Sequence, residues 1–440
     1  MPKAVIIGAS VGGLVAATTL REQGWEVTLL EKGPSVGGLY AVVHTPFGEC
    51  ELGMHVLYVT PHQQAMLMDL FGETAFIEKQ GVDTDLGASF SRGTLHAGSI
   101  YPDVRNSPQR DVIEAQIGQH ARDDTPVNAA EALRARFGPI AAEQVVAPIL
   151  EKLWKKPVTA LAPGALHCYF DVRRIVLADK ASSDALKQDP VLDAVIGNPE
   201  QTAPAGSIFH GRRALFLRHG QGDLASKAVD SLRRAGIQVE FGCDVQLLND
   251  VLSFRGRALS EDYDACIVAS PLNALDRDLA QGLDQMEMSI FYFKTTVQSR
   301  PHPAAYYILC HGPELASSRV VNYPAYNFEN IAHLQGIVAV EVLHEPGDAP
   351  AVQQVRAELQ AVLPELQILD EHAFDRRLRI ASPTTHNAQR LDEAVHRVRS
   401  ASGFEFLYFA GMRTDQGVFF SHHTIGAAYD AALDCSRAQP

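Results

Sequence analysis

The chain has 440 residues, of which 46% are hydrophobic, and this is enough for two or three domains with cores of their own. Its 38 basic and 52 acidic side chains give a net charge of −14, which argues against general binding to nucleic acid or to an anionic membrane surface. No apolar run approaches the ~20 residues of a membrane span, and the N-terminus shows no signal-peptide pattern. We therefore expect a soluble, cytoplasmic protein whose partner is a small-molecule substrate, and the sequence indicates no oligomeric state.

The six cysteines are scattered through the chain without C-x-x-C spacing. Paired cysteines at short spacing are typical of zinc sites, and dense conserved-looking spacing is typical of disulfide frameworks. The sequence therefore predicts neither a metal site nor a set of disulfides.

The N-terminus has the pattern of a strand, a glycine-rich turn and a helix, in the order "AVII", "GASVGG" and "LVAATTLREQG". Gly8 allows a tight turn after the strand, and Gly13 allows the helix to pack closely on the sheet. Ser10 stands where the backbone of a G-x-G-x-x-G turn approaches a pyrophosphate. The amides of a helix that begins near Val11 carry partial positive charge toward such a phosphate.

A second strand pattern, "WEVTLLEK", ends at Glu31, 23 residues after Gly8. An acidic side chain at this distance accepts hydrogen bonds from an adenosine ribose. Because it also disfavours a 2′-phosphate, the sequence indicates FAD or NAD rather than NADP.

The whole stretch "GASVGGLVAATTLREQGWEVTLLEKGPSVGG" resembles the N-terminal fingerprint of the FAD-dependent amine oxidase-like flavoproteins. Two further segments resemble the same proteins. One is "LYFAGMRTDQGVFFSHHTIGAAYDAAL", with a strand that ends at Ala410–Gly411 and a helix expected over "TIGAAYDAAL". The other comprises "GIQVEFGCDVQLL" and "YDACIVASP", in which Val245 matches a backbone contact to adenine. The resemblance implies that the cofactor is FAD.

The residues that this resemblance places at the cofactor are Gly8, Ser10, Gly12, Gly13, Glu31, Lys32, Gly37, Gly38, Leu39, Gly53, Met54, His55, Gly220, Val245, Gly411, Met412, Gly417, Val418 and Phe419.

The three matching segments predict a discontinuous FAD-binding domain formed by residues 1–75, 205–275 and 400–440. Residues 76–204 show apolar residues at helical spacing, which predicts a helical insertion. Residues 276–399 alternate as antiparallel strands do and contain one helix pattern, "APAVQQVRAELQAVLP". The expected fold class is α/β: a Rossmann-type, three-layer ββα FAD-binding domain with an inserted substrate region of helices and an antiparallel sheet.

Four local segments are similar to relatives of UDP-galactopyranose mutase, in the same order along the chain. They are "ELGMHVLYVTPHQQAMLMDLF", "LEKLWKKPVTALAPGALHCYFDVRRI", "GRRALFLRHGQGDLASKAVDSL" and "PELASSRVVNYPAYN". The resemblance implies that His55 lies close to the flavin, that Gly220 passes behind its ring, and that Arg173 or Arg174, together with Arg319, points toward an anionic substrate.

One departure from the mutase pattern concerns the substrate. The mutase uses a pair of tyrosines to hold a diphosphate, one of them near the C-terminal flavin segment, where this chain has Phe419 and Phe420. Phenylalanine cannot donate a hydrogen bond. Tyr307 can supply a hydroxyl, although "AAYYIL" is equally a buried strand, and Phe420 is expected beside the substrate.

Two kinds of activity stay open at this stage. In the first, the protein is an oxidoreductase that takes a hydride from a sugar-derived or other biosynthetic metabolite, with His55, His422 or His423 as acid or base. In the second, it is a non-redox sugar-nucleotide mutase that uses reduced FAD. A flavin-binding protein without catalytic chemistry is a third, lesser possibility, and the two phenylalanines favour the oxidoreductase.

Overall fold

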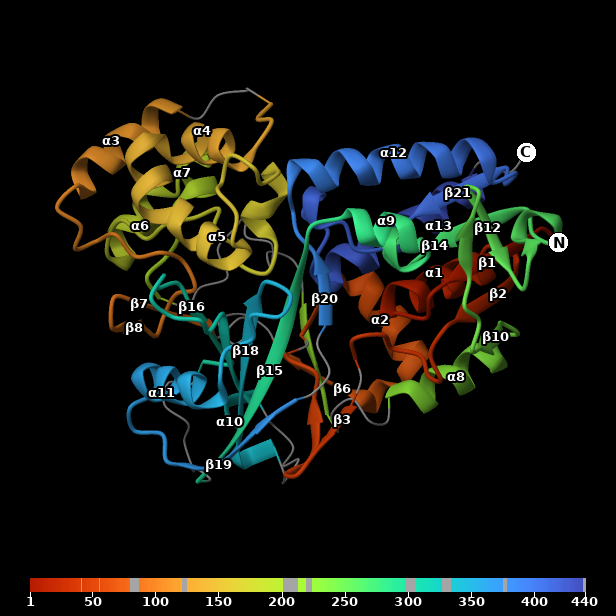
Figure 1. The fold of residues 1–440 in the computed structure, drawn as a ribbon, viewed down its shortest axis with the longest axis horizontal. Helices are drawn as coiled ribbons and strands as arrows, with labels where there is room; N and C mark the ends of the chain where they lie inside the picture. The colour runs from red at the N-terminus through yellow and green to blue at the C-terminus, as the bar shows by residue number, and fades with distance from the viewer. Residues whose placement is uncertain are drawn as a thin grey trace.

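The computed structural model describes residues 1–40, 42–54, 56–79, 87–120, 125–200, 213–218, 224–296, 305–326, 334–374 and 378–437. Figure 1 shows the two chain termini at one end of the molecule and a group of helices from the first insertion at the other. A long, mostly antiparallel sheet lies between and below them.

A five-stranded parallel sheet with the order β10-β2-β1-β14-β21 forms the end that contains the termini. Its strands are β1 (Lys3–Ile7), β2 (Glu26–Glu31), β10 (Gln238–Phe241), β14 (Ala265–Val268) and β21 (Phe406–Phe409). They come from three stretches that lie far apart in the sequence. The central strands β1 and β14 are almost wholly apolar and buried, as expected for a parallel sheet that is covered on both faces.

Two different layers cover this sheet. On one face, α1 (Val11–Glu22) and α13 (Ser421–Arg437) pack together and share a core that includes Ile6 and Ile425. On the other face lies a small antiparallel sheet, and its Leu252 packs in a second core with Val5. That sheet contains β11 (Gln246–Leu248), β12 (Val251–Phe254) and β13 (Arg257–Ala258). These layers are the α/β, ββα arrangement that the sequence predicted.

An eight-stranded sheet forms the second half of the molecule, with the order β19-β15-β18-β17-β16-β7-β8 and with β20 also paired to β15. Its strands are β7 (Gly87–Ser91), β8 (Thr94–His96), β15 (Gln285–Thr295), β16 (Tyr307–Cys310), β17 (Arg319–Asn322), β18 (Ile337–His344), β19 (Ile368–Ala373) and β20 (Leu378–Ala381). Among these described strands, only the pairing of β16 with β7 is parallel. Helix α11 (Val352–Val362) packs against this sheet, and its residues Val355 and Leu359 share a core with Phe291 and Phe293 of β15.

The segment 76–204 is helical over much of its length but also supplies strands β6 (Phe76–Lys79), β7 and β8. Its helices are α3 (Arg110–His120), α4 (Ala129–Ala141), α5 (Ala147–Trp154), α6 (Lys180–Leu186) and α7 (Pro190–Val195). Strands β7 and β8 form a hairpin whose turn residues Arg92 and Gly93 both have positive φ, at 51° and 69°. Such a turn favours a tight hairpin, and it brings this part of the insertion into the second sheet.

The remaining elements connect these parts. They are β3 (Val42–Thr45), β4 (Gly48–Glu51), β5 (Leu57–Val59), α2 (Pro61–Phe71), β9 (Arg213–Leu217), α8 (Leu224–Arg234), α9 (Arg277–Gly282), α10 (Tyr323–Tyr326) and α12 (Thr385–Ala401). Within the described part of the chain, no helix combines the length and the apolar character needed to cross a membrane. The six cysteines are buried free thiols, and the described residues contain no group of three or more side chains suited to hold a metal ion.

Candidate active site

The glycine-rich turn between β1 and α1 has the geometry that its sequence predicts. Gly8 has a φ of 98°, and its N–H donates to the Leu30 carbonyl at 2.8 Å. Ser10 is the N-cap of α1, where its Oγ accepts from the Gly13 N–H at 3.4 Å. A Cβ on Gly13 would lie 2.0 Å from the Gly8 carbonyl oxygen, so the turn and the helix approach each other as closely as only glycine allows.

The Glu31 carboxylate lies at the mouth of this turn. Its Oε2 accepts from the Ala9 N–H and its Oε1 from the Gly33 N–H, each at 2.7 Å. The glycine pair follows closely, because the Gly37 N–H donates to the Ala9 carbonyl at 2.8 Å and Gly38 has a φ of 65°. The end of β2 and the loop after it are thus held against the turn, at the carboxyl edge of the parallel sheet.

Three further residues predicted at the cofactor, of which Val245 was expected beside the adenine, have different exposures. Val245 is buried, whereas Leu39 exposes 52% of its surface. The Lys32 ammonium lies 2.9 Å from the Asp244 carboxylate, and both side chains are exposed. The role of these three residues at a cofactor therefore stays a prediction.

The segment from Gly411 to Phe420 forms a tight loop beside the same edge of the sheet. Arg413 and Val418 exchange two backbone hydrogen bonds, of 2.8 and 2.9 Å, and Gly417 closes the loop with a φ of 76°. A Cβ on Gly411 would lie 2.1 Å from the Ser270 carbonyl oxygen, so this loop crosses directly over the end of β14. Met412 packs against the core that the helical insertion and the eight-stranded sheet share.

The helix after this loop begins three residues earlier than the sequence indicated. Because the Phe420 carbonyl accepts from the N–H groups of His423 and Thr424, α13 begins at Ser421 rather than at Thr424. His422 and His423 therefore lie in the first turn of α13, not in the loop before it. Gly12 of α1 faces this turn, since a Cβ there would lie 3.0 Å from the Thr424 carbonyl oxygen.

The segment that carries Gly53 and Met54 is fixed from the second sheet. The hydroxyls of Tyr292 and Tyr323 both donate to the Glu51 carbonyl, at 2.7 and 2.9 Å. Gly53 has a φ of 87°, and a Cβ there would lie 2.7 Å from Oε1 of Glu341. The neighbouring His55, and Gly220 in the other matched segment, lie outside the described residues.

A continuous run of aromatic rings follows the C-terminal loop. Phe419 contacts Phe420 and Tyr169, with ring centroids 5.4 and 5.9 Å apart. Phe420 stacks on His422 at 5.7 Å with 7° between the planes, and His422 contacts His423 at 4.1 Å. These rings form one connected cluster of phenylalanine, tyrosine and histidine side chains, in which His422 is buried.

Comparison with known proteins places this geometry in a known fold. Residues 6–74 match the family of NAD(P)-binding Rossmann-like domains. The solved structure of reduced UDP-galactopyranose mutase superposes with a TM-score of 0.68 at 17% identity, covering 100% of this chain and 96% of that one. The chain therefore contains a Rossmann-like domain, and its overall fold is similar to that of the mutase.

Other solved structures agree with this assignment of the fold. Putrescine oxidase bound to putrescine has a TM-score of 0.55 at 15% identity, over 99% of this chain and 98% of that one. The fatty acid isomerase from P. acnes that produces CLA has a TM-score of 0.56 at 12% identity, over 100% and 99%. The resemblance predicted from the sequence is confirmed, and at these identities it concerns the fold.

Several groups at the glycine-rich turn are placed where a dinucleotide cofactor could use them. The turn offers the amides at the start of α1, Glu31 is held at its mouth, and a buried hydroxyl, Ser270 Oγ, has no hydrogen-bond partner among the described residues. Ser270 borders the turn, since its Cβ would be 3.2 Å from a Cβ on Gly8. An unpartnered buried hydroxyl beside this turn is a donor that a bound phosphate or ring can use.

The predicted substrate residues have protein partners. Arg173 makes two hydrogen bonds of 2.8 Å to the Asp171 carboxylate. Arg174 is buried and donates to the Asp193 carbonyl at 3.2 and 3.1 Å, and Arg319 pairs with Glu341. Tyr307 lies in β16, largely buried, with its ring against Gly87.

The sequence analysis did not single out His167. Its ring packs on Gly417 and contacts His423 with centroids 6.0 Å apart. Burial, assisted by the nearby Arg173 charge, lowers the pKa of His167 to about 4, so this imidazole is neutral at pH 7. His167 ends a short 3₁₀ helix, Pro163–His167, that carries no periodic pattern, so only the tertiary contact identifies it.

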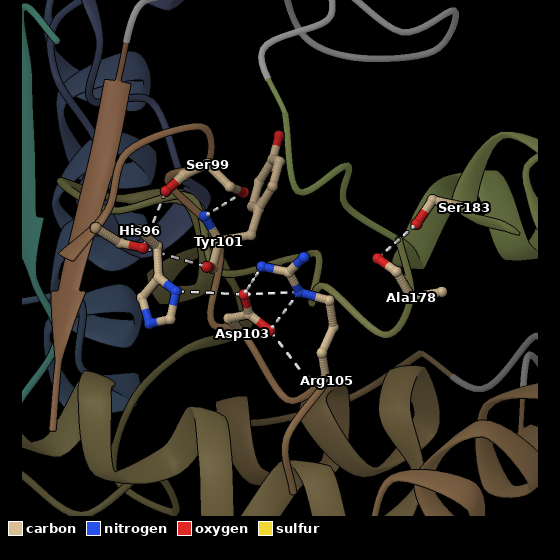
Figure 2. A network of polar contacts seen from close by, with 8 residues as sticks. His96, Ser99, Tyr101, Asp103, Arg105, Ala178 and Ser183 are labelled. Atoms are coloured by element: carbon tan, nitrogen blue, oxygen red, sulfur yellow. Dashed lines mark hydrogen bonds and ion pairs between the residues drawn. The ribbon is translucent and has the colours of Figure 1, made fainter. Parts of the chain in front are cut away.

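A second polar cluster lies outside this region, where β8 meets the helical end (Figure 2). Asp103 accepts hydrogen bonds of 2.7 to 3.1 Å from the backbone and the guanidinium of Arg105, and its Oδ2 lies 3.3 Å from Nδ1 of His96. Burial alone would raise the pKa of Asp103, but these partners hold it well below its usual range. The cluster is a partly exposed ion pair, in which the Asp103 carboxylate is buried, and it joins His96 of the β8 hairpin to the loop that precedes α3.

Proposed function

We propose that the protein is an FAD-dependent oxidoreductase that acts on a small molecule, a sugar-derived or other biosynthetic metabolite. The observation that carries this choice is the pair Phe419–Phe420, which stands in the C-terminal loop in place of hydrogen-bonding side chains. A surface of aromatic rings there excludes water and offers no hydroxyl to a diphosphate.

The pyrophosphate of FAD would lie against the Gly8–Gly13 turn and the first amides of α1, with its ribose at Glu31. The flavin would then lie between the Gly53–Met54 segment and the Gly411–Phe419 loop. When bound there, FAD supplies the acceptor for a hydride from the substrate.

The chain's own residues orient the substrate and control a proton. The Phe419 N–H donates to Nδ1 of His423 at 3.4 Å, which would place the proton of a neutral imidazole on Nε2. His423 can therefore donate a hydrogen bond from Nε2, while the neutral His167 ring beside it can accept one. Phe420, stacked on His422, holds the imidazole pair in place.

The test is an optical experiment on the purified protein. We expect visible flavin bands that bleach on anaerobic photoreduction and return in air, and a screen of metabolites should then find one that bleaches the flavin without light. A folded protein that neither carries nor takes up FAD would overturn the proposal. Conversion of a sugar nucleotide by the reduced protein, without net consumption of the reductant, would instead establish the mutase.

A further inference from the structure

A buried network of three side chains stands between the two segments expected to flank the flavin. Arg319 of β17 makes a bidentate pair with Glu341 of β18, with N–O distances of 3.0 and 2.9 Å and a closest approach of 2.7 Å. The Tyr169 hydroxyl donates to the same carboxylate at 2.6 Å. Glu341 is completely buried, whereas the Arg319 side chain retains 15% of its exposure.

This network touches both flavin-flanking segments. Oε1 of Glu341 lies against the α-carbon of Gly53, and the Tyr169 ring contacts Phe419 with centroids 5.9 Å apart. The Arg319 guanidinium lies over the Tyr169 ring, 5.1 Å from its centroid. A substrate that reaches the flavin between these segments would therefore meet this network.

The network presents no net positive charge. A guanidinium that is paired in bidentate fashion with a carboxylate already uses two of its N–H donors. Most of its positive charge is balanced by the carboxylate. Arg173, the other partly exposed candidate for an anion, is engaged in the same way by Asp171. Breaking such a pair to bind a phosphate would leave Glu341 as an uncompensated buried charge.

We propose that Glu341 is a specificity-determining residue, which cancels the charge of Arg319 and so restricts the site to substrates that carry no phosphate. The location of the substrate in this inference rests on the proposed function, but the charge cancellation does not. On this view the chain retains an arginine that could bind anions, and the carboxylate of Glu341 prevents it from doing so.

The test compares binding of UDP and of inorganic pyrophosphate to the FAD-loaded full-length protein and to E341Q, by titration calorimetry. Glutamine keeps the shape of the side chain but removes its negative charge, so the charge of Arg319 is no longer cancelled, and E341Q should bind both probes at least about tenfold more tightly than the unsubstituted protein. The matched control is E371Q. It makes the same change of net charge in the same sheet but removes the charge that faces Arg356, a partly exposed arginine 2.7 Å from Glu371. E371Q should bind like the unsubstituted protein.

Equal affinity of E341Q and the unsubstituted protein would overturn the proposal. If E341Q does not fold, the double variant R319M/E341M removes both charges and should bind UDP as the unsubstituted protein does. Weaker binding by the double variant would show that Arg319 already holds anions, and it too would overturn the inference. All variants keep the glycine turn at which FAD is proposed to bind. A failure of FAD uptake would be visible in the spectrum, and it is therefore distinguishable from a failure of E341Q to bind anions more tightly.

Discussion

Gly417 occupies a position in the C-terminal loop where the structure leaves no room for a side chain. It has a φ of 76°, and a Cβ there would lie 1.7 Å from Nε2 of His167. Gly417→Ala should therefore lower the free energy of unfolding by about 1–3 kcal/mol through backbone strain, and it should also displace His167. Urea denaturation of the variant measures this loss.

The matched control for this variant is Gly426→Ala, in the middle of α13. A Cβ at Gly426 would meet no atom within 4 Å, and alanine is favoured over glycine in a helix by about 1 kcal/mol. We expect G426A to be as stable as the unsubstituted protein or more so. Equal stability of G417A and G426A would contradict the close packing of His167 on the loop.

His167 also makes the stability of the protein depend on pH. Burial lowers its folded-state pKa to about 4, below the ~6.5 of an unfolded histidine. The unfolded chain then binds the proton more readily, so this contribution is fully present above pH ~6.5 and is lost as the pH falls toward 4. At pH 5 the loss amounts to at most about 2 kcal/mol.

His167→Gln removes this titration. Denaturation at pH 7.5 and at pH 5 should show a smaller loss of stability on acidification for H167Q than for the unsubstituted protein. The same acid-induced loss in both proteins would mean that the imidazole is protonated as easily in the folded state as in the unfolded one.

At the scale of elements, two tyrosines of the second sheet hold the end of β4. Tyr292 and Tyr323 donate to one carbonyl, that of Glu51, just before the Gly53–Met54 segment. Y292F and Y323F should each cost about 1 kcal/mol of unfolding free energy, and the double variant should cost more than the sum, because one carbonyl loses both donors. Y429F is the control, since the Tyr429 ring makes an edge-to-face contact with His62 that phenylalanine preserves. Strictly additive losses would indicate that the two hydroxyls act independently.

The elements that the sequence predicted best are those in which the backbone conformation or a close approach permits only certain residue types. The turn from Gly8 to Gly13 was predictable because close approach of a helix to a strand demands glycine at set spacings. The β7–β8 hairpin was missed because its strands are short, although its Arg92–Gly93 turn was a usable signal. The start of α13 was misplaced because two phenylalanines and two histidines carry no capping signal. The partners of Arg173 and Arg319 are set by chain topology, which a linear pattern does not contain.

At the scale of the whole molecule, the parallel sheet and the eight-stranded sheet have separate cores. Ile6 and Val5 belong to the cores on either face of the parallel sheet, whereas Phe291 and Tyr292 belong to cores of the second sheet. The Gly53 segment and the Gly411–Phe420 loop lie where the two halves meet. A ligand held by both segments would thus couple halves that otherwise have little core in common.

FAD should therefore stabilise the whole chain, by about 2.7 kcal/mol at a free concentration one hundred times its Kd. Glu31→Gln removes the carboxylate expected at the ribose, and the rise in Tm with added FAD should shrink to a small part of that of the unsubstituted protein. Glu26→Gln, at the exposed start of the same strand, changes the net charge equally and should leave the rise in Tm intact. Since the Glu31 carboxylate also accepts from Ala9 and Gly33, E31Q should lose some stability without FAD as well, so the comparison is of FAD-induced shifts rather than of absolute Tm. An undiminished shift in E31Q would show that the ribose does not lie at the end of β2. It would thereby contradict the orientation proposed for the cofactor.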